Sequence, residues 1–350
     1  MKKISTASRL LSRDDFREGV FARDGHRCVV CGAPAVDAHH IVERKLWVDG
    51  GYYLDNGASV CEVHHLQAES TEISCDELRA RCKIDRVLLP DHFCVGEVVD
   101  KWGNPILPSG QRLRGELFDE ESTQKILAPV LHLFTSRVKY PRTYHLSWSP
   151  GKSDDDRTTE DPDEVFGGRD VVVTEKVDGE CTTMYRDYLH ARSLDYAAHP
   201  SRDRVRALHA QVAHEIPDGW RVCGENLYAV HSIAYAELPS HFLVFSIWDA
   251  RNECLAWDET VLWSKLLGLD VVPMLYRGPW DVAAVRALDN VTASKIGGDR
   301  EGYVVRLADS FHYRAFRRSV AKYVRKDHVQ TDDHWKTREV VPNRLSEDAR

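Results

Sequence analysis

The sequence lacks the long apolar segments that place a chain in a membrane or in the secretory pathway. It contains no run of about 18 apolar residues, so no segment is predicted to span a bilayer. The start, residues 1–5, is not an apolar stretch of the secretory type, and no internal repeat is visible. Nine cysteines without a signal peptide indicate a reducing compartment. We therefore expect a cytoplasmic protein.

Length and composition predict a chain of two or three domains. The 350 residues exceed the usual size of one domain, and 43% hydrophobic residues suffice for real cores. The formal net charge is −8, so any basic segment is a local concentration against an acidic average.

A short apolar run ends on Lys176. Residues 171–173 are three valines and predict a buried strand, and Asp178–Gly179 predicts a tight turn directly after it. The lysine then stands at the mouth of a sheet, where its amine can attack phosphorus if a nearby cation or desolvation lowers its pKa. A solvated hairpin turn is the plain alternative for so short a pattern.

Five further motifs follow Lys176 in a fixed order. They are His190–Ser193, Trp220–Tyr228, Phe242–Asp249, Glu301–Arg306 and Ala321–Lys326. These motifs comprise an Arg-Ser pair after a hairpin, a strand ending in Gly-Glu, an aromatic strand, a Glu-Gly strand and a lysine-bearing strand. Each could occur by chance, but the ordered series is specific.

The series resembles the covalent nucleotidyltransferases, that is, polynucleotide ligases and messenger-RNA capping enzymes. It is most similar to the nick-sealing RNA ligase branch, over roughly residues 138–335. The resemblance implies an α+β fold with an ATP-grasp-like ligase core of antiparallel sheets and flanking helices. It also implies three steps: ATP adenylylates Lys176, AMP passes to a 5′-phosphate, and a 3′-hydroxyl attacks that end with release of AMP.

The resemblance assigns roles to the motif residues. Glu225 would hold the ribose, Glu301 would orient Mg²⁺ or Mn²⁺, and Phe245 would stack on adenine. The other candidates are cations aimed at phosphoryl oxygens and groups near the nucleotide: Arg192, Lys322, Arg325, Lys326, Glu175 and Asp178. Taken alone, Phe245 would be a core residue, Glu301 part of a turn and Arg192 a surface residue.

Two positions depart from the RNA ligase pattern. Cys181 stands where this branch often has Asn, which puts one phosphate or metal-water contact in doubt. The last motif is Lys322-x-Val324 in place of Lys-x-Lys, so Arg325 or Lys326 would supply the second positive charge.

Residues 311–326 combine six Lys or Arg with four Phe or Tyr and no acidic residue. Interleaved cations and aromatic rings suit a nucleic-acid backbone or a triphosphate. A solvated helix face is the alternative.

The N-terminal region carries a second signal. Cys28-x-x-Cys31 and Cys61-x-x-His64 form two close pairs separated by a loop, which is typical of a closed tetrahedral zinc site. A disulfide framework is the competing interpretation, and the reducing compartment disfavours it.

This region resembles the HNH endonuclease module, a ββα-metal fold. The resemblance implies that His40 is the base, that Asn56 orients it, and that His39 and His65 bind a catalytic metal. The family normally has a fourth cysteine where His64 stands, and a zinc-containing module that only binds nucleic acid or braces another domain is a common alternative.

The expected organisation is a zinc module at 1–70, a connector at 71–137, a ligase domain at 138–335 and a tail at 336–350. In the connector, 71–83 and 121–134 are expected to be helical, with Ser74 capping the first helix, and the acidic stretch 153–164 is expected to be a solvated loop. Only 24 residues follow Lys326, too few for the OB domain of DNA ligases and capping enzymes.

Three functions follow from these patterns. The first is an ATP-dependent RNA ligase with a structural Zn²⁺, whose substrate is RNA ends, in the alternative forms of a nicked duplex or an RNA–DNA hybrid. The second is a nuclease plus ligase in nucleic-acid repair or processing. The third is a non-catalytic nucleic-acid-binding protein with a decayed ligase core. The intact Lys176, Glu225 and Glu301 argue against decay.

Overall fold

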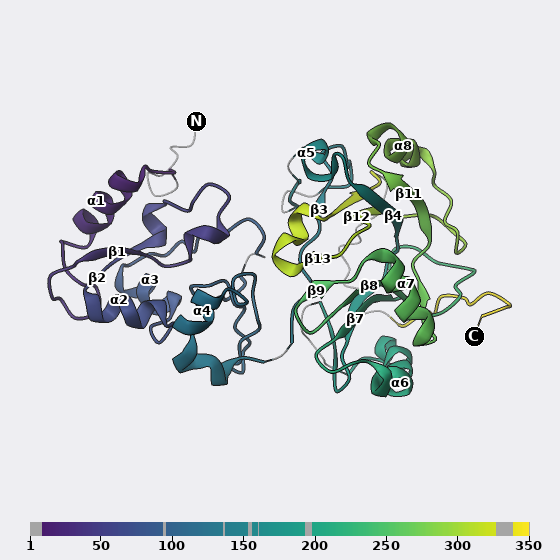
Figure 1. The fold of residues 1–350 in the computed structure, drawn as a ribbon, viewed down its shortest axis with the longest axis horizontal. Helices are drawn as coiled ribbons and strands as arrows, with labels where there is room; N and C mark the ends of the chain where they lie inside the picture. The colour runs from purple at the N-terminus through teal and green to yellow at the C-terminus, as the bar shows by residue number, and fades with distance from the viewer. Residues whose placement is uncertain are drawn as a thin grey trace. The chain divides into compact units, whose positions relative to one another are not determined.

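The computed structural model describes residues 9–93, 96–135, 137–152, 156–159, 161–192, 198–326 and 339–349. It divides into two compact units, Met1–Val138 and Lys139–Arg350, and each is described by itself (Figure 1). No helix in these ranges is long and apolar enough to cross a membrane.

A small β-hairpin followed by a helix forms the centre of the N-terminal unit. Strands β1 (Asp37–His40) and β2 (Gly57–Val60) pair antiparallel, and α2 (Glu62–Glu69) follows directly. The other helices are α1 (Arg13–Arg23), α3 (Cys75–Arg81) and α4 (Glu121–Ile126), with 3₁₀ turns η2 (Arg44–Leu46), η3 (Leu54–Asn56) and η4 (Ala128–Leu133). The element order β1, β2, α2 is the ββα order that the HNH-like resemblance implies.

Residues 71–137, expected to be a connector, pack onto this ββα element. Trp102, Phe118 and Leu127 share one buried cluster with Ile41 and Val60. The predicted cap is confirmed, because Ser74 Oγ accepts a hydrogen bond from the Glu77 amide at 3.1 Å. The second predicted helix is α4 followed by a 3₁₀ turn, η4, which begins at Ala128–Pro129.

The C-terminal unit contains two sheets. The first has the order β11-β4-β12-β14-β3, and its strands are β11 (Met274–Pro279), β4 (Asp170–Lys176), β12 (Gly302–Leu307), β14 (Val320–Val324) and β3 (Tyr144–His145). The second has the order β13-β9-β8-β7-β5-β6, with β10 also paired to β8. Its strands are β13 (Phe311–His312), β9 (Glu253–Cys254), β8 (Phe242–Trp248), β7 (Arg221–Asn226), β5 (Glu180–Met184), β6 (Leu189–Ala191) and β10 (Asp270–Val271). Pairing is antiparallel except for β14–β3 and β10–β8.

Helices and 3₁₀ turns complete the unit. The α-helices are α5 (Pro162–Phe166), α6 (Asp203–Val212), α7 (Trp257–Leu266) and α8 (Val282–Arg286). The 3₁₀ turns are η5 (Pro200–Arg202), η6 (Ala213–Glu215), η7 (Ala287–Asn290) and η8 (Tyr313–Arg318). This mixed fold with antiparallel sheets agrees with the predicted α+β class.

Strand β4 has the predicted position and burial. The three valines at 171–173 are fully buried, and the strand ends at Lys176. The turn at Asp178–Gly179 is not a hairpin, because β4 pairs with β11 and β12 whereas β5 pairs with β6 and β7. The chain therefore passes from one sheet to the other immediately after Lys176.

Residues 311–326 are strand β13, the 3₁₀ turn η8 and strand β14, so the alternative of a solvated helix face is wrong. Phe311 and Tyr323 are buried because their strands are paired within the sheets, and Phe316 of η8 is buried in the same hydrophobic cluster. Cations on the exposed surface of the segment include Arg314 and Arg318. Of the acidic stretch 153–164, residues 153–155 and 160 lie outside the described residues, and α5 begins at Pro162.

Candidate functional sites

The Lys176 amine is bound to a carboxylate from the neighbouring strand. Gly302 lies directly opposite Lys176 in the β4–β12 pair, and Glu301 is the residue directly before β12. Lys176 Nζ lies 2.5 Å from Glu301 Oε2, and the lysine side chain is about one quarter exposed. Burial alone would lower the pKa of Lys176, but Glu301 and then Glu225 outweigh it, and the pKa is raised.

Glu225 lies on β7 of the second sheet and is hydrogen-bonded to the turn after Lys176. Its Oε1 accepts from the Gly179 amide at 3.2 Å. A Cβ on residue 179 would lie 2.5 Å from Asn226 O, so only glycine allows this approach. Burial, and then repulsion from Glu301, raises the pKa of Glu225 to about 8 despite the attraction of Lys176. One ammonium beside two carboxyl groups leaves Glu225 without a full positive partner, and a divalent cation bound there would favour its ionised form.

Glu175 and Asp178, the candidate residues for nucleotide binding, accept hydrogen bonds from two loops near Lys176. Glu175 points to the other face of β4, where it accepts from Ser294 Oγ at 2.6 Å and the Lys295 amide at 2.8 Å. Asp178 Oδ2 accepts from the Ser232 amide at 2.8 Å and from the following amide at 3.0 Å.

The segment 339–349 packs against the loop around residues 227–235, which Asp178 also contacts. Asn343 is buried, accepts from the Tyr235 amide at 2.7 Å and donates to Leu227 O at 2.8 Å. The Tyr235 hydroxyl in turn accepts from the Asp178 amide at 2.9 Å. The chain's last described residues thus stabilise the surroundings of Lys176.

Lys322 shares the face of the first sheet that carries Lys176. It lies opposite Val304, which lies opposite Thr174, two residues before Lys176. Burial, followed by repulsion from Lys176, lowers the pKa of Lys322 to about 8. Val324 stands where the RNA ligase pattern has its second lysine. Its side chain is buried and supplies no positive charge to the site.

Other predicted cations are placed differently. Arg192 follows the β5–β6 hairpin, as predicted, and its amide donates to Cys181 O at 3.0 Å; its partner in the motif, Ser193, lies outside the described residues. Arg325 lies 3.9 Å from Asp299 Oδ2, and Lys326 is exposed. The Nε atoms of Arg192 and Arg325 are buried without a hydrogen-bond partner among the described residues, so each can still donate.

Phe245 is the extra residue of a β-bulge. The register between β7 and β8 shifts there, with Cys223 opposite Ser246 and Gly224 opposite Val244. Bulges re-aim a side chain and are common beside functional sites. The ring is half-buried and packs edge-to-face on Tyr140 at 5.0 Å.

Sequence patterns did not identify a group of residues around Asp156. Its Oδ1 lies 3.4 Å from His145 Nε2, 3.6 Å from Arg142 Nη2 and 3.7 Å from Lys322 Nζ. Burial, and then Lys322, lowers the pKa of His145 to about 4. A carboxylate from the acidic stretch therefore lies among cationic or polar groups that could also face a phosphate.

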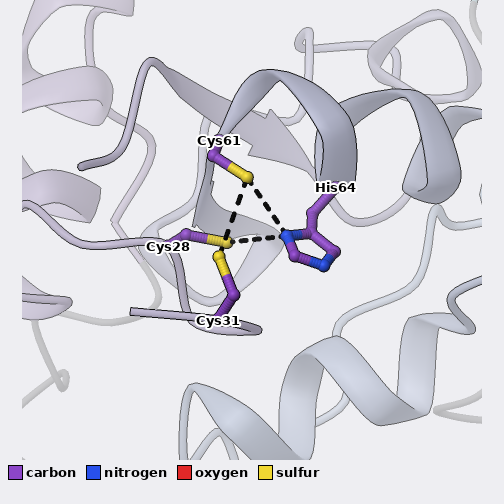
Figure 2. Close-up of side chains that lie close together, drawn as sticks. All are labelled: Cys28, Cys31, Cys61 and His64. Carbon is purple, nitrogen blue, oxygen red and sulfur yellow. Dashed lines mark hydrogen bonds between the residues drawn. The ribbon is translucent and has the colours of Figure 1, made fainter. Parts of the chain in front are cut away.

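The structure brings together the four predicted zinc ligands (Figure 2). His64 Nδ1 lies 3.1 Å from Cys61 Sγ and 3.4 Å from Cys28 Sγ, and Cys31 Sγ lies 3.9 Å from Cys61 Sγ. Tetrahedral zinc with Zn–S bonds of about 2.3 Å separates two sulfurs by about 3.8 Å. Burial raises the pKa of Cys28, but hydrogen bonds from the amides of Cys31, Cys61 and Val30 prevail and lower it to about 6. The cluster therefore fits one zinc ion.

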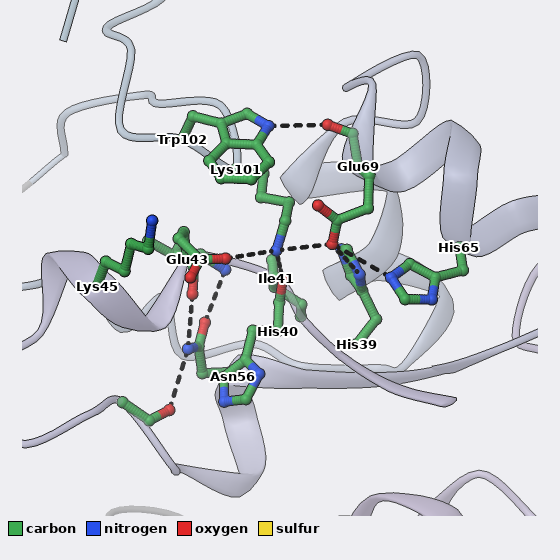
Figure 3. Close-up of polar contacts among 12 residues, drawn as sticks. His39, His40, Ile41, Glu43, Lys45, Asn56, His65, Glu69, Lys101 and Trp102 are labelled. Atoms are coloured by element: carbon green, nitrogen blue, oxygen red, sulfur yellow. Dashed lines mark hydrogen bonds and ion pairs between the residues drawn. The ribbon is translucent and has the colours of Figure 1, made fainter. Parts of the chain in front are cut away.

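The predicted catalytic-metal residues also meet, with partners that the sequence did not reveal (Figure 3). Glu69 Oε1 lies 3.3 Å from both His39 Nδ1 and His65 Nε2, and His65 Nδ1 lies 3.1 Å from Asp37 Oδ2. The hydrogen bond to Glu69 raises the pKa of His65, whereas burial lowers that of His39 to about 4. Lys101 Nζ lies 3.1 Å from the same oxygen of Glu69.

His40 and Asn56 lie apart from this cluster. His40 points to the opposite face of β1 from His39, where its ring stacks on Phe16 at 4.5 Å. The Asn56 side chain accepts from the Val42 amide at 2.9 Å and donates to Val42 O and Gly51 O at 3.0 and 3.1 Å. The side-chain amide of Asn56 thus joins the segments around Val42 and Gly51 by hydrogen bonds.

A family model described as RNA ligase matches residues 169–324. The matched segment is less than half of the chain, and it includes Lys176, Glu225, Glu301 and Lys322. It supports an RNA ligase-type nucleotidyltransferase domain in the C-terminal unit. No curated protein matches the chain.

Solved structures with partial similarity include ligases from several organisms. An RNA ligase mutant from Naegleria gruberi, with ATP and Mn, is 17% identical over 55% of this chain and 56% of that chain, with a TM-score of 0.39. An archaeal ATP-dependent RNA ligase is 17% identical over 54% and 48%, with a TM-score of 0.35. A putative ATP-dependent DNA ligase from Aquifex aeolicus is 18% identical over 54% and 50%, with a TM-score of 0.37. The match spans about half the length of each of these proteins.

Proposed function

We propose that the chain is an ATP-dependent RNA ligase that joins 3′-hydroxyl and 5′-phosphate ends through a covalent AMP on Lys176. The observation that carries this proposal is the position of Lys176. Its amine stands at the end of a buried strand, beside Glu301 and near Glu225, where the chain crosses between two sheets. The RNA ligase family match over the same residues supports it.

The first step forms a bond between Lys176 Nζ and the α-phosphorus of ATP, and pyrophosphate leaves. The amine must lose its proton, which Glu301, 2.5 Å away, is placed to accept. Glu301 is also placed to hold Mg²⁺ or Mn²⁺, which when bound would neutralise phosphate charge and favour the unprotonated amine. Lys322, on the same sheet face, contributes positive charge toward the phosphates.

AMP transfer and end joining, the second and third steps, also need positive charge next to the phosphoryl oxygens. A 5′-phosphate oxygen attacks the phosphorus of the lysyl adduct, the P–N bond breaks, and AMP moves to the RNA end. The 3′-hydroxyl of the other end then attacks that 5′-phosphorus, and AMP leaves. Arg192 and Arg325 each have a buried Nε without a described partner, so they are candidates to bind these phosphates.

Glu225 is suited to the ribose. Its pKa of about 8 means that the carboxyl is largely protonated at neutral pH before nucleotide binds, so it can donate as well as accept a hydrogen bond. Phe245 is the candidate to stack on adenine, because the bulge turns it out of the regular ladder.

In the N-terminal unit we propose that Cys28, Cys31, Cys61 and His64 bind one structural Zn²⁺. The support is the convergence of three sulfurs and one imidazole nitrogen at distances that suit tetrahedral zinc.

Incubation with labelled ATP and Mg²⁺ or Mn²⁺ tests the ligase proposal. We expect a covalent AMP adduct that maps to Lys176 and is absent from Lys176→Ala. The matched control, Lys265→Ala on α7, should retain the adduct, and labelled GTP should give none. An adduct on another residue, or one that persists in Lys176→Ala, would overturn the assignment.

A further inference from the structure

The side chains of His39, His65 and Glu69 have the chemistry of a second metal site. Their ligand atoms lie within 4.8 Å of one another, and His39 is almost wholly buried. Two imidazoles and a carboxylate suit a divalent transition metal. The HNH-like resemblance places a catalytic metal at this position.

A cation from the chain already lies in this cluster. Lys101 Nζ lies 3.1 Å from Glu69 Oε1, the oxygen that also faces His39 and His65. The ammonium also donates to Glu43 Oε2 at 3.1 Å and to His40 O at 3.2 Å. Figure 3 shows it between the two carboxylates. Its side chain is only 4% exposed, so the three oxygens replace water as its partners.

The backbone around Lys101 is fixed from both sides. The Glu43 amide donates to Lys101 O at 2.8 Å, and the next residue, Trp102, donates from its indole to Glu69 O at 2.8 Å. On the other side, Asp100 Oδ1 accepts from the amides of Trp102 and Asn104 at 2.9 and 3.0 Å. The ammonium is therefore positioned by a hydrogen-bonded turn, in which Trp102 belongs to the hydrophobic core of the module.

We infer that the Lys101 ammonium takes the place of a divalent metal at His39, His65 and Glu69, so that the module carries no metal in this second site. A doubly charged ion there would lie close to the Lys101 charge, and the repulsion would be strong in a buried site. His40, the candidate base, lies on the other face of β1. The inference makes the module a binding or bracing element, and it is independent of the ligase proposal.

Metal content of the full chain tests this inference. Variants Lys101→Met, which removes the charge at similar length, and Lys101→Arg, which keeps it, are compared with Lys45→Met. Lys45 is a suitable control because it is half exposed and pairs only with Glu120 among the described residues. Each protein is titrated with Mn²⁺ and Co²⁺, with bound ions counted per chain and cobalt absorption recorded.

We expect one zinc per chain in the wild type, in Lys45→Met and in Lys101→Arg. Lys101→Met should bind one further ion at least tenfold more tightly than the wild type, and His65→Ala in that background should remove it. A second ion in the wild type that is lost in His65→Ala would overturn the inference, whether or not Lys101→Met folds. A folded Lys101→Met that binds no additional ion would also contradict it.

Discussion

Lys176 and Glu301 are joined by a 2.5 Å ion pair although 125 residues separate them in the chain. The antiparallel pairing of β4 with β12 creates this contact, because Gly302 lies opposite Lys176. The same contact raises the pKa of the amine that must act as a nucleophile. The Glu301 carboxylate therefore has two opposite effects: it supports adenylylation, and it raises the pKa of the Lys176 amine. A single substitution can separate these two effects.

Glu301→Gln should lower the rate of adenylylation by about 100-fold or more, because it removes a charged group that helps to stabilise the transition state of phosphoryl transfer. At the same time it should lower the pKa of Lys176, because the neighbouring negative charge is gone. Labelling of Lys176 by an amine-reactive reagent, quantified by mass spectrometry at pH 8, should therefore become faster. Glu259→Gln on α7 is the control. Equal losses in both assays would show that the variant only distorts the strand.

Phe245 tests whether the bulge serves the nucleotide or the core. Stacking on a base contributes roughly 1–3 kcal/mol. Phe245→Leu keeps most of the apolar volume and removes the aromatic face, so it should raise KM for ATP by roughly 5- to 150-fold with little change in thermal stability. Unchanged KM with a lower melting temperature would make Phe245 a core residue.

Local patterns predicted the elements that depend on nearest neighbours in the chain. The valines at 171–173 form a buried strand, the hairpin precedes Arg192, and Ser74 caps α3. Each of these follows from propensity, side-chain alternation or capping within a few residues.

Contacts between distant segments could not be predicted. Lys101 lies 58 residues from Glu43, and Asp156, which precedes α5, lies 3.7 Å from Lys322 on β14. Neither residue belongs to a motif, since any buried cation or carboxylate needs a partner but no local spacing says which one. For the same reason the aromatic residues at 311–326 predict a binding surface, whereas three of them, on β13, η8 and β14, are buried in one hydrophobic cluster.

The charge on Lys322 should set an alkaline limit for ATP binding. Its pKa is lowered to about 8, so the ammonium is charged below this pH and neutral above it. KM for ATP should rise as pH increases beyond 8, by at most about tenfold per pH unit for one group. Lys322→Arg should remove this rise, because a guanidinium stays charged. Lys265→Arg should behave as the wild type. An identical alkaline rise in Lys322→Arg would exclude Lys322 as its source.

Loss of zinc should separate the two units functionally. Cys31→Ser removes one sulfur from a four-ligand site, and the loop and helix that carry the ligands are expected to lose their order without the metal. The variant should contain no zinc and show greater proteolysis within 9–93, while Lys176 still forms the AMP adduct.

If the N-terminal unit holds the polynucleotide, joining of RNA ends should fall at least tenfold more than adenylylation in this variant. Cys82→Ser is the matched control, because Cys82 lies in the same unit but outside the zinc cluster. It should keep zinc and both activities. Equal loss of adenylylation and joining in Cys31→Ser would assign the unit a general stabilising role. Freshly purified wild type without zinc would refute the metal site itself.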